Sequence, residues 1–167
     1  MTDTAPTGRL FTGEQLAGLL PLLKDADSVE LKLTIPESNR QSAITALEMD
    51  PLEAQVRQVF FFDTPDLRLY RAGVVVRARR VQGRANDSVM KLRPVDPAQV
   101  PSHLRKSPTF VVEVDAMPGG FVCSGSFKAR LTGDEVPGVV RGVKPIRKLY
   151  TREQREFVAE HASPSAT

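Results

Sequence analysis

Four stretches of this sequence alternate charged and apolar side chains with a period of two residues. They cover residues 28–35, 74–81, 88–93 and 109–115. Successive side chains of a strand point to opposite faces, so each stretch would put its charges on one face and its apolar side chains on the other. The sequence therefore predicts a sheet with one apolar face and one charged face.

The charged face carries four pairs of residues, each pair on its own strand: Glu30 and Lys32, Arg77 and Arg79, Lys91 and Arg93, and Glu113 and Asp115. Alternation by itself is typical of a solvated outer face. Three details favour a binding surface instead. Nearly all these positions are ionised, the acids lie on other strands than the arginine pair, and arginine presents a planar fork that suits phosphate.

A charged face that lines the inside of a closed or half-closed barrel would bring its cations together around an anion. Cations around one cavity repel each other, which favours a polyanionic ligand. Carboxylate oxygens are hard ligands that suit Mg²⁺ or Mn²⁺. The charged face thus indicates a site for a polyphosphate and one of these two metal ions.

The remaining elements predict an α+β domain with helices packed on one side of a largely antiparallel sheet. Helices are expected from residue 13, after residue 36 and over 151–161, and an aromatic strand over 55–63. Residues 126–131 are predicted to be helical and 143–149 extended. One domain would cover 13–161, between a disordered N-terminus at 1–12 and a tail at 162–167.

Composition excludes several other classes of protein. The single cysteine, Cys123, permits neither an internal disulfide nor a cysteine metal site, and it is expected to be buried. A net charge of +3 is too small to indicate nucleic-acid binding. No run reaches the roughly 18 apolar residues of a membrane span, and no apolar signal core opens the chain. These features predict a cytoplasmic protein without a membrane partner.

Three segments together resemble the CYTH domain: residues 29–32 (VELK), 61–69 (FFDTPDLRL) and 73–80 (GVVVRARR). The likeness extends in order and spacing over about residues 28–150. The family comprises class IV adenylyl cyclases, thiamine triphosphatases and inorganic tripolyphosphatases, also called triphosphate tunnel metalloenzymes.

The resemblance implies an antiparallel tunnel of eight strands with charged residues inside. It implies phosphate contacts from Lys32, Arg77, Arg79, Lys91, Arg93 and Arg147. It implies Glu30, Glu113 and Asp115 as ligands of Mg²⁺ or Mn²⁺, with Glu113 and Asp115 also catalytic. The function expected is metal-dependent binding and hydrolysis of a triphosphate, inorganic or organic. The alternatives are a non-catalytic polyphosphate- or nucleotide-binding protein and a class IV-type adenylyl cyclase.

Two departures from the family change these expectations. Ser28 stands where the family pattern Glu-x-Glu-x-Lys has its first glutamate. The family's C-terminal strands also have no counterpart, so a partial CYTH-like β-tunnel of five to six strands is predicted. Exposed strand edges would favour a homodimer. Phe60, Phe61 and Phe62 are expected in the core, which makes stacking on nucleic acid unlikely as a function.

Overall fold

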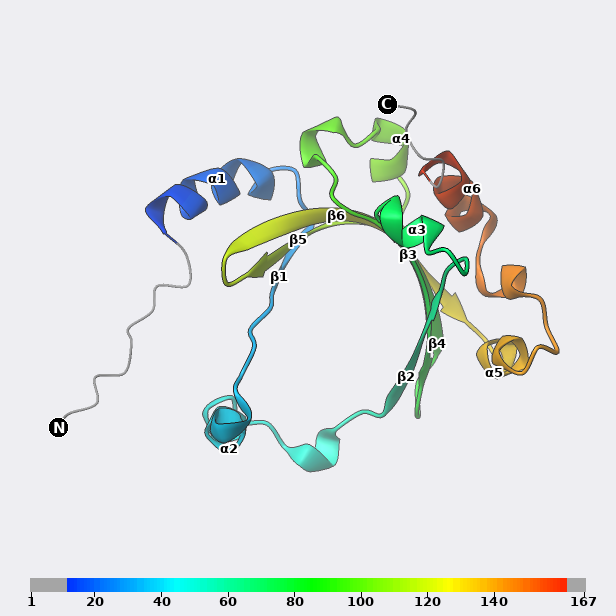
Figure 1. Ribbon diagram of the computed structural model, residues 1–167, viewed down its shortest axis with the longest axis horizontal. Helices are drawn as coiled ribbons and strands as arrows, with labels where there is room; N and C mark the ends of the chain where they lie inside the picture. Colours follow the sequence, from blue (N-terminus) through cyan, green and yellow to red (C-terminus); the bar gives the residue numbers. More distant parts are fainter. Residues whose placement is uncertain (1–11, 162–167) are drawn as a thin grey trace.

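The computed structural model describes residues 12–161 and shows an α+β fold, as predicted. A strongly curved sheet of six strands has most of its helices on its convex side, whereas the helix of residues 40–46 lies across from its concave side (Figure 1). The N-terminus expected to be disordered covers residues 1–12, of which 1–11 lie outside the described residues, as does the tail 162–167. Within residues 12–161, no helix is both long enough and apolar enough to cross a membrane.

The strands are β1 (Ser28–Leu31), β2 (Arg57–Phe62), β3 (Val74–Val81), β4 (Asn86–Leu92), β5 (Phe110–Met117) and β6 (Gly120–Leu131). Their order across the sheet is β1-β5-β6-β4-β3-β2. All neighbours are antiparallel except β1 and β5, which are parallel. The sheet is not closed, because β1 and β2 are its free edges, and a complete CYTH-like tunnel is therefore not seen.

Two of the predicted elements are wrong. Residues 126–131 are not helical but form the end of β6, a strand of 12 residues. Pairing with β4 and β5 fixes the extended backbone there, and this long-range pairing overrides local helix preference. Residues 143–149 are not extended: they end in a 3₁₀ helix, η4 (Ile146–Leu149), that follows Pro145.

The first strand is shorter than the alternating pattern of residues 28–35 predicts. Its last paired residue is Leu31, opposite Ala116, and one further bond joins the amide of Lys32 to the carbonyl of Ala116. The partner strand β5 then ends at Met117 and turns at Gly119. Residues 33–35 consequently have no strand to pair with.

The helices are α1 (Gly13–Leu23), α2 (Arg40–Ala46), α3 (Arg68–Arg71), α4 (Ser102–Arg105), α5 (Glu135–Val140) and α6 (Arg152–His161). Three further 3₁₀ helices are η1 (Glu37–Asn39), η2 (Pro51–Glu53) and η3 (Pro97–Gln99). The helices predicted from residue 13, after residue 36 and over 151–161 are confirmed. The predicted turn after β2 is held by Asp63, whose carboxylate accepts hydrogen bonds from the amides of Leu69 and Tyr70 at 3.0 and 2.9 Å.

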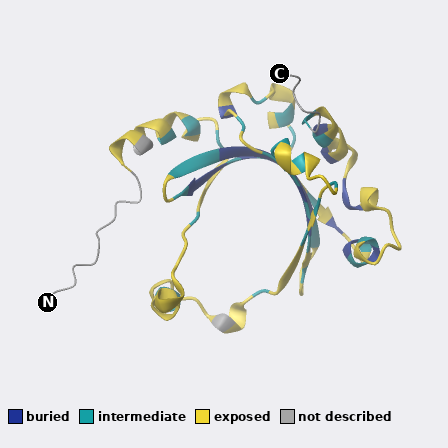
Figure 2. Ribbon diagram, in the orientation of Figure 1, coloured by how far each residue is buried: buried dark blue, intermediate teal, exposed yellow. Residues whose placement is uncertain are grey.

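The hydrophobic core lies between the convex face and the helices (Figure 2). The rings of Phe110 and Phe127 on the sheet and Phe157 on α6 meet edge to face, with centroids 5.0–5.8 Å apart. Cys123 is buried, as predicted. Packing on this side leaves the concave face as the open side of the sheet.

A buried glutamine fixes α6 on the sheet. The side chain of Gln154 accepts from the Ser88 hydroxyl and donates to the carbonyls of Ser88 and Phe127, all at 3.3 Å. It also accepts from the amide of Thr151 at 2.9 Å. A buried amide with its polar atoms satisfied stabilises the arrangement and ties α6 to β4 and β6.

A long connection, residues 32–56, runs from one free edge of the sheet to the other (Figure 1). It is mostly exposed (Figure 2), and its apolar residues Leu47, Met49 and Leu52 are 64%, 58% and 93% exposed. The free edges that would favour a homodimer are thus present. Dimerisation itself stays a prediction.

Substituting Phe127→Ala should lower the free energy of unfolding by about 3–5 kcal/mol, because it removes the central ring of the aromatic cluster and leaves a cavity. Urea denaturation followed by circular dichroism measures this. The matched control is Phe61→Ala, since Phe61 is 67% exposed on the other face. Equal losses in the two variants would contradict the assignment of the core to the convex face.

Candidate functional site

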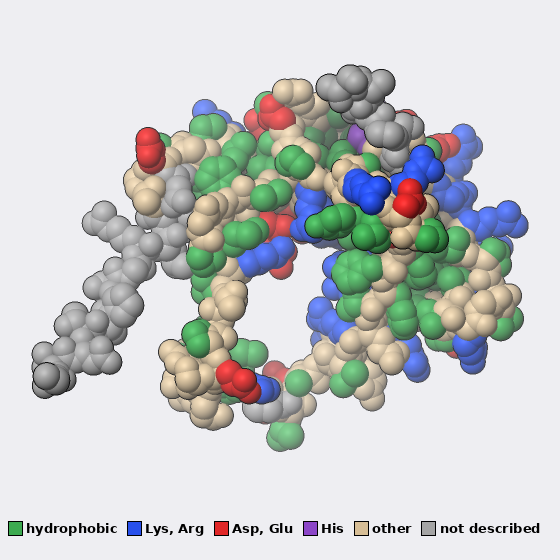
Figure 3. All heavy atoms as spheres, in the orientation of Figure 1, with side chains coloured by type: hydrophobic (Ala, Val, Ile, Leu, Met, Phe, Trp, Pro, Cys, Tyr) green, Lys and Arg blue, Asp and Glu red, His purple; other side chains and the backbone are tan. Residues whose placement is uncertain are grey.

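A cavity of about 370 Å³ occupies the concave face. Figure 3 shows the molecule hollowed through its middle, with basic and acidic side chains around the opening. The ionic residues that line the cavity are Glu30, Lys32, Arg77, Arg79, Lys91, Arg93, Glu113 and Lys128, and the apolar ones are Phe61, Val75 and Val89. The charged face of the sheet therefore points into a hollow, and five of the six predicted phosphate-binding cations meet there.

Strand β3 shows how the sequence pattern builds this surface. Val74, Val76 and Ala78 are buried in the core, whereas Arg77 and Arg79 alternate with them and are half-buried toward the cavity. Pairing places Arg77 between Phe61 on β2 and Val89 on β4. The two-residue period predicted from the sequence is thus confirmed for this strand.

Arg93 reaches the cavity from the residue that follows β4. Its amide donates to the carbonyl of Gly73 at 2.9 Å. Gly73 has a positive φ of 72°, and a Cβ atom there would collide with the carbonyl oxygen of Arg93. The glycine permits the close approach of the two chain segments and so fixes the backbone of Arg93.

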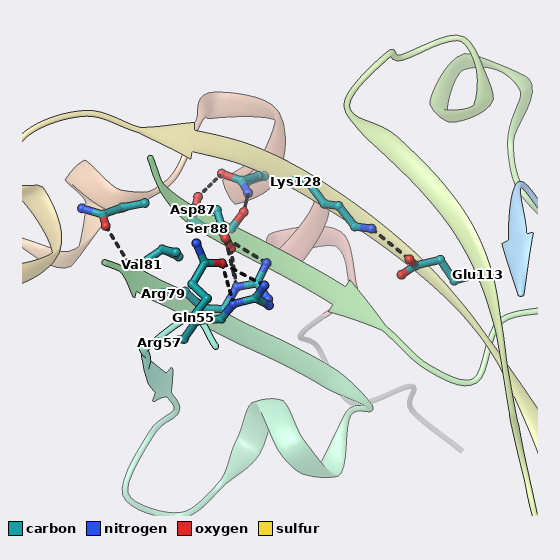
Figure 4. A network of polar contacts seen from close by, with 10 residues as sticks. Gln55, Arg57, Arg79, Val81, Asp87, Ser88, Glu113 and Lys128 are labelled. Atoms are coloured by element: carbon teal, nitrogen blue, oxygen red, sulfur yellow. Dashed lines mark hydrogen bonds and ion pairs between the residues drawn. The ribbon is translucent and has the colours of Figure 1, made fainter. Parts of the chain in front are cut away.

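The acidic residues of β5 pair with lysines from β4, from β6 and from the residue just after β1. Asp115 is buried, and its Oδ2 lies 2.9 Å from Nζ of Lys32 and 4.0 Å from Nζ of Lys91. Glu113 accepts from Nζ of Lys128 at 2.9 Å (Figure 4) and lies 3.2 Å from Nζ of Lys91. The two carboxylates are consequently counter-ions of lysines. Their negative charge holds the lysine ammonium groups on the cavity wall.

Burial by itself would raise the pKa of Glu113. The hydrogen bond from Lys128 and the charge of Lys91 outweigh burial, so the pKa of this carboxyl lies below its ordinary value of 4.5. Glu113 is therefore ionised at neutral pH in this arrangement.

Arg79 has its own counter-ion. Its Nε donates to both oxygens of Asp87 at 2.9 Å, and its Nη2 lies 2.8 Å from Oδ2 (Figure 4). This bidentate pair orients the guanidinium along the cavity wall.

Arg77 is different. Among residues 12–161, neither Arg77 nor Arg93 takes part in an ion pair. The Nε of Arg77 is buried and has no hydrogen-bond partner. Burial, and after it the charge of Arg79, lower the pKa of Arg77. The charges of Asp87, Glu113 and Glu30 act in the opposite direction on this pKa. The site thus contains a half-buried cation that has no direct ion-pair partner among residues 12–161.

Three carboxylates are the available oxygen ligands for a metal ion. Glu30 stands opposite Asp115 in the β1–β5 pairing, and Glu113 lies two residues from Asp115 on β5. Oδ1 of Asp115 is buried and has no hydrogen-bond partner among the described residues, which is compatible with a metal ligand. The part of the chain described here nevertheless contains no group of three or more His, Cys, Asp or Glu side chains already gathered for a metal. Lysines occupy that space between the acids.

The structure does not bring Arg147 to the cavity. It lies on η4, exposed on the helical side of the sheet, and its carbonyl accepts from Arg155 at 3.3 Å. The sequence suggests Arg147 and Lys148 as a further cationic contribution, with a plain surface role as the alternative, and the resemblance implies a basic position there. The 3₁₀ helix turns this segment along the convex side, where its Leu149 is buried in the core.

Two residues of the site are not found by the sequence reasoning. Lys128 falls in the segment predicted to be helical, although the alternation of Ser124, Ser126 and Lys128 with small or apolar neighbours is a strand signal. Asp87 lies just before the stretch predicted as a strand, and its pairing with Arg79 depends on the β3–β4 register. The local sequence does not determine how the residues of β3 and β4 are paired.

Neither a protein-family model, nor a curated protein, nor a solved structure matches this chain. The likeness of its motifs to the CYTH domain therefore stays a prediction. Function has to follow from the cavity itself.

Glu113→Gln should make the protein less stable at neutral pH, because Lys91 and Lys128 lose their shared counter-ion. A carboxyl with a lowered pKa stabilises the folded state above its unfolded pKa, and this contribution disappears as the pH falls through the folded value. The difference in unfolding free energy between wild type and variant should thus be largest near pH 7 and shrink below pH 4.5.

Urea denaturation across this pH range measures that difference. Glu30→Gln is the control, since Glu30 is 57% exposed and lies 3.8 Å from its lysine. It should change stability little at any pH. A difference for Glu113→Gln that stays constant with pH would rule out the ion pairs as its cause.

Proposed function

We propose that the cavity binds a triphosphate and hydrolyses it with the help of Mg²⁺ or Mn²⁺. The observation that carries this proposal is Arg77, a half-buried guanidinium whose Nε is unsatisfied and which has no ion-pair partner in the part of the chain that the structure describes. Leaving such a group without a partner costs free energy, and an anion in the cavity recovers it. Arginine is suited to this because its fork binds two phosphate oxygens at once.

A chain of phosphates fits this cavity better than a single phosphate does. The cations come from β3, β4, β6 and the residues just after β1 and β4, so they surround the hollow from several sides. Each charge on a linear polyanion can meet a different cation. Repulsion among the cations falls as the anion neutralises them.

Hydrolysis requires stabilisation of the charge that develops on the transferred phosphoryl group. Arg77, Arg79 and Arg93 supply fixed donors for that charge in a partly desolvated site. Glu113 and Asp115, with Glu30 beside them, would hold the metal ion. A bound Mg²⁺ or Mn²⁺ supplies further charge neutralisation and lowers the pKa of a coordinated water.

The resemblance to the CYTH domain supports the same proposal. The VELK segment supplies Glu30 and Lys32, and the GVVVRARR segment supplies Arg77 and Arg79. These four residues line one cavity although more than 40 positions separate the two segments.

Binding without catalysis is the second candidate function. It is favoured by the lysine contacts of Glu113 and Asp115, because these carboxylates are already neutralised. In this case the acids would only keep the lysines apart until an anion binds.

Wild-type protein with Mg²⁺ or Mn²⁺ should release phosphate from inorganic tripolyphosphate. Arg77→Ala should slow this release by about 100-fold, because it removes a donor aimed at the developing charge. A colorimetric phosphate assay measures both rates.

The matched control is Arg80→Ala, which removes an exposed arginine from the opposite face of β3. Arg147→Ala is a second control on η4. Neither should change the rate more than about twofold, since surface substitutions away from a site have small effects. No release by folded wild-type protein, or equal loss in Arg77→Ala and Arg80→Ala, would refute the catalytic proposal.

Glu113→Gln separates hydrolysis from simple binding. An enzyme should lose turnover in this variant, by about 100-fold or more, because a carboxylate at the metal site is removed. Calorimetric titration with tripolyphosphate should show affinity kept or increased, since Lys91 and Lys128 are released from their counter-ion. Unchanged turnover would exclude Glu113 from catalysis.

A further inference from the structure

A stripe of apolar side chains lies on the outer face of β1 and of the residues that follow it. Val29, Leu31 and Leu33 are 50%, 54% and 52% exposed, and they alternate with Glu30 and Lys32, which line the charged cavity. Successive side chains of an extended chain point to opposite faces, so the three apolar side chains share the convex face. Exposed apolar side chains gathered on one face indicate a surface that a partner covers.

The backbone of β1 is also available to a partner. Within residues 12–161, β5 is the only strand that pairs with it, at one end of the sheet (Figure 1). The amide of Lys32 points toward β5 and donates to the carbonyl of Ala116 at 2.8 Å. Alternate residues of a strand direct their backbone groups to opposite sides, so Leu31 directs its amide and carbonyl toward the free edge, as Leu33 does in a continued strand. Such unpaired groups are a template for another strand.

The alternating pattern of the sequence is longer than the strand that the single chain forms. The pattern covers residues 28–35 and stops before Pro36, whereas β1 ends at Leu31 and β5 ends at Met117. Residues 32–35 thus have the sequence of a strand but no neighbouring strand in the described part of their own chain. A second chain along the free edge would supply that neighbour.

The charges of this segment select one register for pairing with a second copy. Two copies related by a two-fold axis would pair β1 with β1 in antiparallel orientation. Registers centred on residues 30, 31 and 32 all join backbone groups that point outward. A centre at Glu30 or at Lys32 would set like charges opposite each other, which is destabilising. A centre at Leu31 sets Glu30 opposite Lys32 of the second copy, and Val29 opposite Leu33.

We propose that two copies of this chain associate through β1, antiparallel and centred on Leu31, so that their sheets become continuous. The inference does not depend on the proposed function. Val29, Leu31 and Leu33 of the two copies cover one another on the convex face. On the concave face, Lys32 of the second copy lies at the rim of the charged cavity beside Glu30. A lysine on an edge strand ordinarily opposes pairing, and here the glutamate compensates for it.

The other free edge of the sheet is less suited to a partner. On the convex face of β2, Phe60 and Phe62 already pack against the core of their own chain. Its exposed apolar residues, Val59 and Phe61, are 44% and 67% exposed and lie on the concave face. The part of β2 that faces the helices therefore has no uncovered apolar stripe.

Leu31→Asp tests the interface, because the two-fold arrangement sets the two new carboxylates opposite each other. Sedimentation velocity of the full chain, from low micromolar to near-millimolar concentration, measures the dissociation constant. An interface of two short strands is small, so we expect a micromolar value for wild type. Leu31→Asp should raise it about tenfold or more. The matched control is Leu47→Asp, at a residue that is 64% exposed outside the interface, and it should change the value less than about twofold.

Cysteine cross-linking tests the register. Leu31→Cys should form a disulfide between copies under mild oxidation, because the Cα atoms of a hydrogen-bonded pair lie about 5.5 Å apart. Val29→Cys and Leu33→Cys should each fail to cross-link alone and should cross-link when mixed, because Val29 faces Leu33 of the second copy. Wild type is the control, since its one cysteine, Cys123, is buried.

A concentration-dependent dimer that Leu31→Asp disrupts, together with this cross-linking pattern, supports the proposal. Wild-type protein that stays monomeric over the whole range overturns it. A dimer that folded Leu31→Asp leaves intact also overturns it and assigns the contact to another surface, such as the edge of β2. Self-cross-linking of Val29→Cys or Leu33→Cys in preference to Leu31→Cys overturns the register and with it the proposal.

Discussion

Repulsion between neighbouring cations is the constraint on which this structure depends. Arg77 and Arg79 are two residues apart on β3, and Lys91 faces the same hollow from β4. Their side chains would separate if the backbone were free to move. The hydrogen-bonded pairing of β2, β3, β4 and β6 prevents that, and the aromatic packing of Phe110, Phe127 and Phe157 holds the convex face against the helices. The core thus supplies the free energy that keeps a charged concave face assembled.

The carboxylates reduce the repulsion around some of these cations and not around others. Lys32, Lys91 and Lys128 each have a carboxylate partner on β5, and Arg79 has Asp87. A lysine ammonium is strongly hydrated and is held as a point charge, whereas an arginine fork is oriented by a bidentate partner. Arg77 and Arg93 remain without a partner within the described part of the sequence. Most cations of the site are therefore neutralised by a carboxylate. Arg77 and Arg93 are the ones left available to an anion.

The sequence predicts the charged face well because alternation is a local property. The bounds of β3 agree with the prediction residue by residue, and five of six expected cations line the cavity. Pairing between strands is not local, which explains the errors. The extended state of residues 126–131 depends on β4 and β5, and the parallel pairing of β1 with β5 has no signal in either segment. Arg147 was expected at the site from its charge and from the resemblance, but η4 carries it to the helical side. The lysine partners of Glu113 also required the structure, because two other strands, β4 and β6, supply them.

The spread of the cations bears on chemistry as well as on affinity. Binding energy gained far from the reacting atoms can be used to position them. Under the proposed function, Arg93 and Lys32 would hold one part of a phosphate chain while Arg77 and Arg79 meet another. A chain held by several fixed cations would keep one position relative to Glu113, which lines the same cavity. The strand pairing that keeps the cations in place would therefore also position a phosphate for hydrolysis.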